Sequence, residues 1–580
     1  MKKFYFIILF FCCYLHSTAV LTLPRFFSNN MVLQQNTQTN FWGKADAGKT
    51  ISITASWGQS TSVVTNASGV WTTKIQTPVA IPGQAPTYSI TITDGTTTIN
   101  LNNVLVGEVW VSNGQSNMWL HAGYQPTVFA VYHKAELDAA NFPNIRFLTI
   151  NPPVSLQTKT ATLPVVDSTW MVCSPTSAYN FAFIPFYFAR ALYSHPALNV
   201  PIGMINTSWA GRPISDFMSA TALASSTSVI NYNAGSPQSS VYLPMIKQII
   251  PYSIKGMIWY QGEYNVNSPT AGYTDSQAAM IADYRASWGT NFSFYTVQLA
   301  PYFDPTTHPS NRDLSYGIPL FREVQNAIVN TPKTGIVVNA DLCPDSANLR
   351  QIHPLNKRPV GERLAALALV KDYGINMVCE GPTYLSHKIQ GSTIVVSYKP
   401  STLGTGLMTK DGKSVSNFRI AGSDNKFYPA LAIISANTVI VSSPNVPNPV
   451  NVRYAFSDGA MTNLQNIEGF PAFPFRTDNL SGLNGATYID LAYPSITANA
   501  NVLEPKISCS PNPVQDILNI NFSENDIYMV ELLDINGRIL ISKKMNHSGP
   551  ISLSAFSTNI YFCRLKSTAG FNKMVKIIKC

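Results

Sequence analysis

The chain has little charge and, after its first residues, no long apolar run. Charged residues make up 12% of its 580 residues, and its formal net charge is +9. No Lys/Arg cluster is interleaved with aromatic residues, so charge does not favour nucleic acid or a membrane surface as a partner. No later apolar run reaches the length of a membrane-spanning helix, so we expect no membrane span in the mature chain.

Cysteine is also scarce. The chain has eight, and their spacings contain no C-x-x-C pair or similar zinc motif, so we expect no metal site. Six of them lie beyond the first 19 residues. Sequence alone leaves their pairing open, although we favour a bridge between Cys343 and Cys379.

The N-terminus carries the features of an export signal. Lys2 and Lys3 precede the apolar stretch from Phe4 to Leu15, and small residues follow up to Ala19. This order is typical of a secretory signal peptide that is removed near residue 19. We therefore expect a protein that is secreted or held at the cell surface.

The expected secondary structure changes along the chain, and a chain of this length is expected to form several domains. Residues 20–105 alternate apolar and polar side chains at period two, as a β-sandwich requires. Residues 106–378 alternate strand-like runs with helix-like segments, which is the order of an α/β domain. The expected strands are at 104–112, 200–206, 254–261, 292–299 and 335–340, and the expected helices are at 185–193, 277–286 and 358–370. A β-rich domain is expected over 379–478 and a linker over 479–504. A small separate β domain would then occupy 505–580.

Four polar stretches follow predicted strand ends in the α/β part. They are GQSNM at 114–118, NTSWAG at 206–211, WYQGE at 259–263 and IHP at 352–354. The carboxyl ends of parallel strands meet at one edge of a sheet, so these stretches can form one site. Ser116 is then either a polar turn residue or a nucleophile. The elbow G-x-S-x-G of α/β-hydrolases is absent, because Met118 stands where its second glycine would be.

The chain resembles the bacterial sialate O-acetylesterases, within the SGNH (GDSL-like) hydrolases. The resemblance covers residues 23 to about 477, and these segments carry it: LPRFFSNNMVLQQ, GEVWVSNGQSNM, MINTSWAGRPISDF, IWYQGEYN, IHPLNKRPVGERLA and PVNVRYAFSDGAMTNLQNIEGFPAFPFRT. It implies an α/β fold with an SGNH-type three-layer α/β/α hydrolase core flanked by β-sandwich domains. It also implies ester hydrolysis without a metal or an organic cofactor.

The resemblance assigns roles to individual residues. Ser116 matches the nucleophile, and His353 matches the general base. The backbone N–H groups of Ser116 and Gly211, with the Gln261 carboxamide, would bind the oxyanion, and Ala210 is the alternative to Gly211. Residues expected to touch substrate are Gln115, Arg212 and Glu263, although Glu263 could instead position Gln261 or be an ordinary loop residue.

The acid partner of His353 departs from the family pattern. Many relatives carry an aspartate two or three residues before the histidine, but this chain has Arg350 and Gln351 there. Asp341, just beyond a predicted strand, is the nearest candidate, with Asp345 behind it. The other interpretation is a Ser–His dyad in which a backbone carbonyl orients the imidazole. We expect Arg350 to face solvent or pair with an acid.

The last part of the chain, with SPNP, DINGR and IYFCRL, resembles the sorting domain that directs Bacteroidetes proteins through type IX secretion. A carbohydrate-binding or adhesive β module is the alternative. The implied partners are therefore an O-acetylated sugar and the secretion machinery. The function implied is a secreted sialate O-acetylesterase. An acetylxylan or other polysaccharide esterase and a non-catalytic glycan-binding protein remain the alternatives.

Overall fold

The computed structural model describes residues 20–151, 169–226, 239–266, 271–303, 317–342, 352–480, 486–489, 508–521, 528–534, 538–567 and 572–579. The expected signal peptide lies outside these residues, as does most of the expected linker. Cys343 is also outside them, but Cys379 is a free thiol. The bridge that we favoured between these two cysteines is therefore wrong.

The N-terminal part is built from β-strands, as its period-two pattern predicts. Apolar side chains at alternate positions of β3 are buried, and the neighbouring strands enclose them. The strands are β1 (Val32–Gln34), β2 (Gln38–Lys44), β3 (Thr50–Ala55), β4 (Ser60–Val64), β5 (Val70–Gln76), β6 (Tyr88–Thr93) and β7 (Thr98–Gly114).

Strand β7 joins the first two parts of the chain. Its first half pairs with β6 in antiparallel fashion, and its second half pairs with parallel strands of the central sheet. Residues Val106 to Gly114 are all buried, which explains the apolar run before GQSNM. The boundary that we expected at residue 105 thus falls inside one continuous strand.

The central sheet has the order β13-β12-β11-β7-β10-β8-β9. Its neighbours run parallel except for the pair β8 and β9. The strands beside β7 are β8 (Phe142–Thr149), β9 (Met171–Cys173), β10 (Ile202–Asn206), β11 (Gly256–Tyr260), β12 (Ser293–Val297) and β13 (Thr334–Val337). Each strand expected from residues 106–378 is present. Because β10 and β11 flank β7, the segments that follow these three strands lie side by side.

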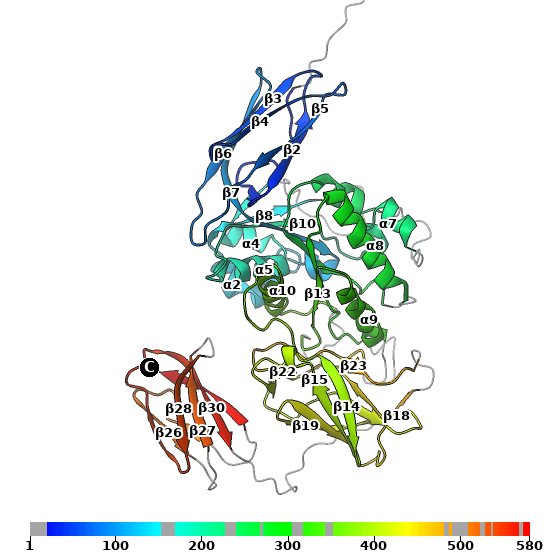
Figure 1. Ribbon diagram of the computed structural model, residues 1–580, viewed down its shortest axis with the longest axis vertical. Helices are drawn as coiled ribbons and strands as arrows, with labels where there is room; N and C mark the ends of the chain where they lie inside the picture. Colours follow the sequence, from blue (N-terminus) through cyan, green and yellow to red (C-terminus); the bar gives the residue numbers. More distant parts are fainter. Residues whose placement is uncertain are drawn as a thin grey trace, which may run out of the picture.

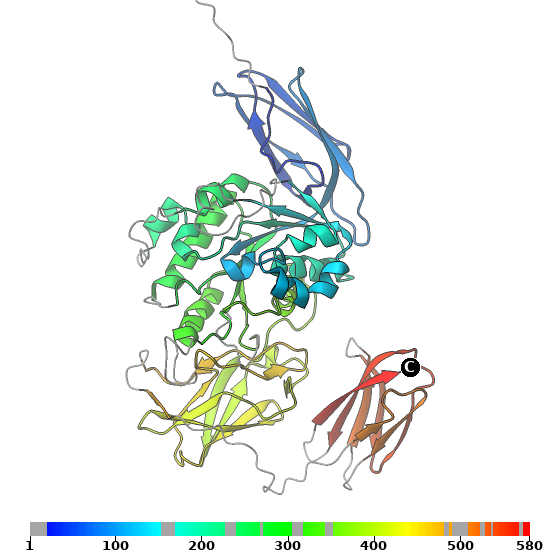
Figure 2. The same ribbon diagram turned by 180° about the vertical axis from the view of Figure 1, so that it is seen from behind.

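Helices cover this sheet in two groups (Figures 1 and 2). One group contains α2 (Lys134–Asp138), α4 (Pro175–Tyr179), α5 (Phe183–Ser194) and α10 (Arg358–Lys371). The other contains α7 (Ala220–Ser225), α8 (Ala271–Trp288) and α9 (Gly317–Asn326). Short helices α1 (Ser116–Trp119) and α6 (Ile214–Phe217) follow β7 and β10. The expected helices correspond to α5, α8 and α10.

A β-rich part follows α10. One sheet has the order β14-β15-β20-β19, and a second has the order β23-β21-β17-β18-β24, with a core of its own between them. The members are β14 (Tyr384–Gln390), β15 (Thr393–Tyr398), β17 (Phe418–Ala421), β18 (Lys426–Pro429), β19 (Leu431–Ser435), β20 (Thr438–Ser442), β21 (Asn451–Tyr454), β23 (Phe475–Arg476) and β24 (Thr487–Tyr488). A pair of β16 (Leu407–Thr409) and β22 (Leu464–Asn466) completes it.

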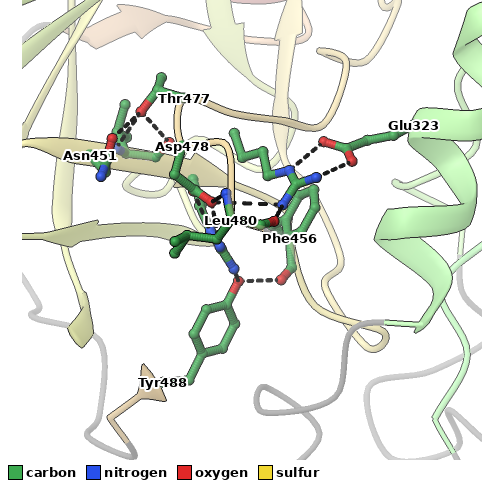
Figure 3. Close-up of polar contacts among 10 residues, drawn as sticks. Glu323, Asn451, Phe456, Thr477, Asp478, Leu480 and Tyr488 are labelled. Carbon is green, nitrogen blue, oxygen red and sulfur yellow. Dashed lines mark hydrogen bonds and ion pairs between the residues drawn. The ribbon is translucent and has the colours of Figure 1, made fainter. Parts of the chain in front are cut away.

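Charged side chains fasten the β-rich part to the central domain. Figure 3 shows Glu323 on α9 facing the β-rich strands, where both of its oxygens accept hydrogen bonds from Arg476 at 2.8 and 2.9 Å. Asp478, two residues further on, binds Arg453 through two hydrogen bonds of 2.7 Å. Loss of either partner of a buried pair would leave the other charge uncompensated, which destabilises the fold.

The C-terminal part contains two further sheets around a separate core, with orders β25-β26-β29 and β28-β27-β30-β31. Its strands are β25 (Ser508–Ser510), β26 (Ile517–Asn521), β27 (Tyr528–Leu533), β28 (Ile539–Met545), β29 (Gly549–Ser552), β30 (Asn559–Ser567) and β31 (Asn572–Lys579). In the described parts of the chain, no helix has the length and apolar character needed to cross a membrane.

Candidate active site

Ser116 begins α1 at the carboxyl end of the central strand β7. The turn before it requires Gly114, which has a φ of 130°, and a Cβ at this residue would lie 2.2 Å from the Tyr260 carbonyl oxygen. Glycine thus lets the backbone leave β7 close beside β11. Ser116 is half-buried, so its hydroxyl is held by a rigid strand end and still faces accessible space.

The structure brings His353 to Ser116. The His353 Nε2 atom lies 2.9 Å from the Ser116 Oγ atom, although 237 residues separate the two in sequence. His353 comes from the segment that precedes α10. Burial, and then the positive charge of Lys357, lower the pKa of His353 to about 4. The imidazole is therefore neutral at pH 7, as a base that accepts the serine proton must be.

Asp341 is not brought to His353. Its two carboxylate oxygens accept hydrogen bonds of 2.7 Å from the Arg363 guanidinium, and Lys410 lies 3.6 Å away. Burial raises the pKa of Asp341, but Arg363 and Lys410 outweigh burial and hold it below its usual range. This geometry does not support our expectation that Asp341 orients the imidazole. Asp345 and Arg350 lie outside the described residues.

Gly211 lies in the loop after β10, and it is the left-handed residue there, with a φ of +66°. Ala210 does not have a positive φ, so the backbone conformation favours Gly211 over Ala210 as the position that requires glycine. The loop is tied to the serine turn by a 2.8 Å hydrogen bond from the Trp209 N–H to the Gly114 carbonyl. Within the described chain, the N–H groups of Ser116 and Gly211 donate to no protein acceptor.

Gln261 has a different task from the one that we expected. Its Nε2 donates to the Arg212 carbonyl at 3.1 Å and to Asn265 Oδ1 at 2.6 Å, so both amide hydrogens are engaged. Its Oε1 accepts a 2.8 Å hydrogen bond from the Tyr273 hydroxyl, and the side chain is fully buried. The oxyanion role assigned to this carboxamide is therefore corrected: Gln261 braces the Gly211 loop.

The three expected substrate residues differ in their exposure. Gln115 is buried, and its Oε1 accepts from the N–H groups of Gly262 and Tyr264 at 3.4 and 3.2 Å. The Glu263 carboxylate is also enclosed, and its Oε1 accepts from Asn117 at 2.5 Å. In the described structure, Gln115 Oε1 and Glu263 Oε1 therefore bind neighbouring protein groups. Arg212 is partly exposed and lies 3.3 Å from Asp216.

Asn117 and Lys357 were not among the residues expected at the site. Both are buried beside the reacting pair, where Lys357 Nζ donates to Asn117 Oδ1. Each lies inside a quoted motif, GQSNM or IHPLNK, and its place in that motif was the signal that could have found it. Among all the residues that the structure describes, no group of three His, Cys, Asp or Glu side chains could hold a metal ion.

Comparisons with known proteins identify the kind of enzyme to which this chain is similar. A family model described as carbohydrate esterase, sialic acid-specific acetylesterase, matches residues 106–369. A solved carbohydrate acetylesterase from Xanthomonas citri is similar with a TM-score of 0.68 and 30% identity, covering 80% of this chain and 100% of that one. The chain belongs to the carbohydrate acetylesterases.

Curated relatives point the same way. The sialate O-acetylesterase of Homo sapiens is 29% identical over 401 residues, which are 63% of this chain and 73% of the relative. The rat enzyme of the same name is 27% identical over 422 residues. The protein is accordingly a carboxylic ester hydrolase, and the resemblance stated from the sequence is confirmed.

The C-terminal resemblance is confirmed as well. A family model described as secretion system C-terminal sorting domain matches residues 509–580. The protein is thus directed by type IX secretion to the cell surface or beyond. An adhesive or sugar-binding module, our alternative for this part, receives no support from the match.

Proposed function

We propose that this protein removes O-acetyl groups from sialic acids through an acetyl-enzyme formed on Ser116. The observation that carries the proposal is the 2.9 Å contact between Ser116 Oγ and His353 Nε2, in a chain of the acetylesterase family. The substrate class follows from the relatives, which are named sialate O-acetylesterases. The parallel sheet with helices in two groups supports an SGNH-type core.

The first half of the reaction transfers the acetyl group. His353 Nε2 accepts the Ser116 hydroxyl proton while Oγ attacks the acetyl carbonyl carbon. The tetrahedral oxyanion accepts hydrogen bonds from the free N–H groups of Ser116 and Gly211. The ester bond to the sugar then breaks, and the sugar oxygen takes the proton from Nε2. In the second half, water gives a proton to Nε2, attacks the acetyl-enzyme and releases acetate, and Ser116 regains its proton.

The catalytic unit that we propose is a Ser–His dyad. For Nε2 to accept the serine proton, the neutral imidazole must carry its own proton on Nδ1. In the part of the chain that the structure describes, Nδ1 makes no hydrogen bond to a carboxylate, and Asp341 is held by Arg363. Solvent or a main-chain carbonyl would then accept the Nδ1 proton.

Export and domain division are part of the same proposal. Residues 1–19 would be removed as a signal peptide, and residues 479–504 would link the β-rich part to the sorting domain.

Arg212, which is partly exposed beside the Gly211 loop, offers a positive group to a substrate carboxylate. The core of 106–378 would carry the chemistry between β domains.

Acetate release tests the proposal. Wild-type protein should hydrolyse a simple aryl acetate, and Ser116→Ala should reduce kcat at least about a thousandfold while the protein stays folded. Retained turnover in this variant would overturn the acetyl-enzyme. Comparing O-acetylated sialic acid with acetylated xylo-oligosaccharide then tests the substrate, since faster release from the xylo-oligosaccharide would contradict the sialate assignment.

A further inference from the structure

Asn117, next to the nucleophile, lies at the centre of a buried polar cluster. Its Nδ2 donates to Glu263 Oε1 at 2.5 Å and to the Ile352 carbonyl oxygen at 3.1 Å. Its Oδ1 accepts from the Lys357 ammonium. One side chain thus joins the serine helix α1, the loop after β11 and the segment that carries His353.

The orientation of this amide follows from the chemistry of its partners. A carboxylate only accepts hydrogen bonds, so Nδ2 must face Glu263, and an ammonium only donates, so Oδ1 must face Lys357. The second hydrogen of Nδ2 reaches the carbonyl that directly precedes His353. All of the amide's hydrogen-bonding groups are therefore used, and a residue without an amide cannot replace it.

The cluster also fixes two charges beside the base. Lys357 directly precedes α10 and is almost completely buried, and Asn117 lies between it and Glu263. Burial lowers the pKa of Lys357 to about 7, and Glu263 opposes this shift. Among the described groups, Lys357 is the charge that acts on His353, and it also acts on His133, whose Nε2 lies 2.9 Å from the Leu355 carbonyl.

We propose that Asn117, Lys357 and Glu263 are positioning residues for the esterase reaction. Asn117 holds Ser116 and His353 in register by binding the residue before the base, and the Lys357 charge disfavours a proton on the imidazole before attack. Glu263 balances that charge inside the domain. This inference rests on the proposed Ser–His reaction, because it assigns these residues to that pair.

The bridge is tested first through Asn117→Ala with an aryl acetate. We expect kcat to fall about a hundredfold and KM to change less than about threefold, because misplacement of the reacting atoms affects the chemical step. Unchanged kcat in a folded Asn117→Ala variant would overturn the positioning role. A fall in kcat no larger than the loss of folded protein would also overturn it, because Asn117 would then act on stability and not on position.

The role of the Lys357 charge is tested through the pH dependence of kcat/KM. A purely structural role of Lys357 would not shift the acidic limb of this profile. Removing the Lys357 ammonium with Lys357→Met takes away a positive charge near His353, so the acidic limb of the profile should move to higher pH. Lys134→Met, which removes an exposed lysine on α2, is the control and should leave the limb in place. An unmoved limb in Lys357→Met contradicts the inference.

Two further variants keep the outcomes apart. If Lys357→Met does not fold, Lys357→Met with Glu263→Gln removes both buried charges together and should still move the limb upward, though less than the single change. Ser116→Ala reports on the proposed function itself. Turnover retained in Ser116→Ala overturns the Ser–His reaction, whereas its loss, with the limb unmoved in the lysine variants, overturns the positioning inference alone.

Discussion

Arg363 binds both carboxylate oxygens of Asp341 at 2.7 Å, at the end of the segment that follows β13. The same guanidinium donates to the Val338 carbonyl oxygen at 2.9 Å. Lys410 of the β-rich part donates to the Asp341 carbonyl oxygen at 3.0 Å. Asp341 thus fastens α10 and the β-rich part to the edge of the central sheet, a short distance in sequence before the loop to His353.

This relationship predicts that Asp341→Asn affects stability more than chemistry. Breaking a buried pair on one side leaves Arg363 uncompensated, which costs about 3 kcal/mol or more. The thermal unfolding midpoint should fall, whereas kcat, measured well below that midpoint, should change less than about tenfold. A severe loss of kcat with an unchanged midpoint would instead restore Asp341 as the acid partner of His353.

The pH dependence of this effect has a defined sign. The pKa of Asp341 is lower in the folded protein than its ordinary value, so its stabilising contribution is present above the ordinary pKa and is lost as pH falls through the folded value. The difference in midpoint between wild type and Asp341→Asn should therefore narrow in acid. Differential scanning calorimetry at pH 7 and in the acidic range measures it.

The depressed pKa of His353 predicts activity well into the acidic range. The imidazole becomes protonated only as pH falls through about 4, so kcat/KM should hold down to that region and then decline. His353→Ala should lose nearly as much kcat as Ser116→Ala, and the double variant little more, since the two side chains act as one unit. Additive losses would contradict the Ser116–His353 pairing, and an acidic limb near the ordinary histidine range would contradict the lowered pKa of His353.

Gly211 offers a test of the oxyanion site. Its φ of +66° disfavours any residue with a Cβ, although no atom lies within 4 Å of where that Cβ would be. Gly211→Ala should therefore turn the backbone N–H and lower kcat between about tenfold and a thousandfold, with little change in KM. Gly289→Ala is a matched control, because Gly289 has the same φ of +66° and equally open surroundings at the end of α8. Equal effects of the two changes on kcat would argue against an oxyanion role for Gly211.

Features of the fold that depend on local sequence pattern could be predicted from the sequence. Apolar runs predicted β7, β10, β11, β12 and β13 of the central sheet, and the polar motifs after them predicted one site at its edge. The family resemblance then paired Ser116 with His353 in that site. The expected β texture on either side of the central domain is also present.

The partners of individual polar side chains were beyond the sequence. Asp341 is near His353 along the chain, yet Arg363 of α10 donates hydrogen bonds to both of its carboxylate oxygens. Gln261 occupies a family donor position, but its hydrogens meet one acceptor in the loop after β10 and one in its own loop. Such pairings depend on long-range packing, which single residue types and spacings do not encode.

Gln261 gives the last prediction, because scaffold and oxyanion roles differ in what they change. An oxyanion donor acts only in the transition state, so its loss costs on the order of 3 kcal/mol in kcat and leaves the folded state intact. A brace fixed by Arg212, Asn265 and Tyr273 acts in every state, so Gln261→Met should lower the thermal unfolding midpoint together with kcat. Tyr273→Phe separates the two further. It removes the hydroxyl that donates to Gln261 Oε1 and to the Gln261 carbonyl oxygen and that accepts from Trp259 Nε1. A shared loss of midpoint and kcat is therefore expected if Gln261 braces the Gly211 loop. Full kcat and an unchanged midpoint in Tyr273→Phe, with a pure kcat loss in Gln261→Met, would return Gln261 to the oxyanion site.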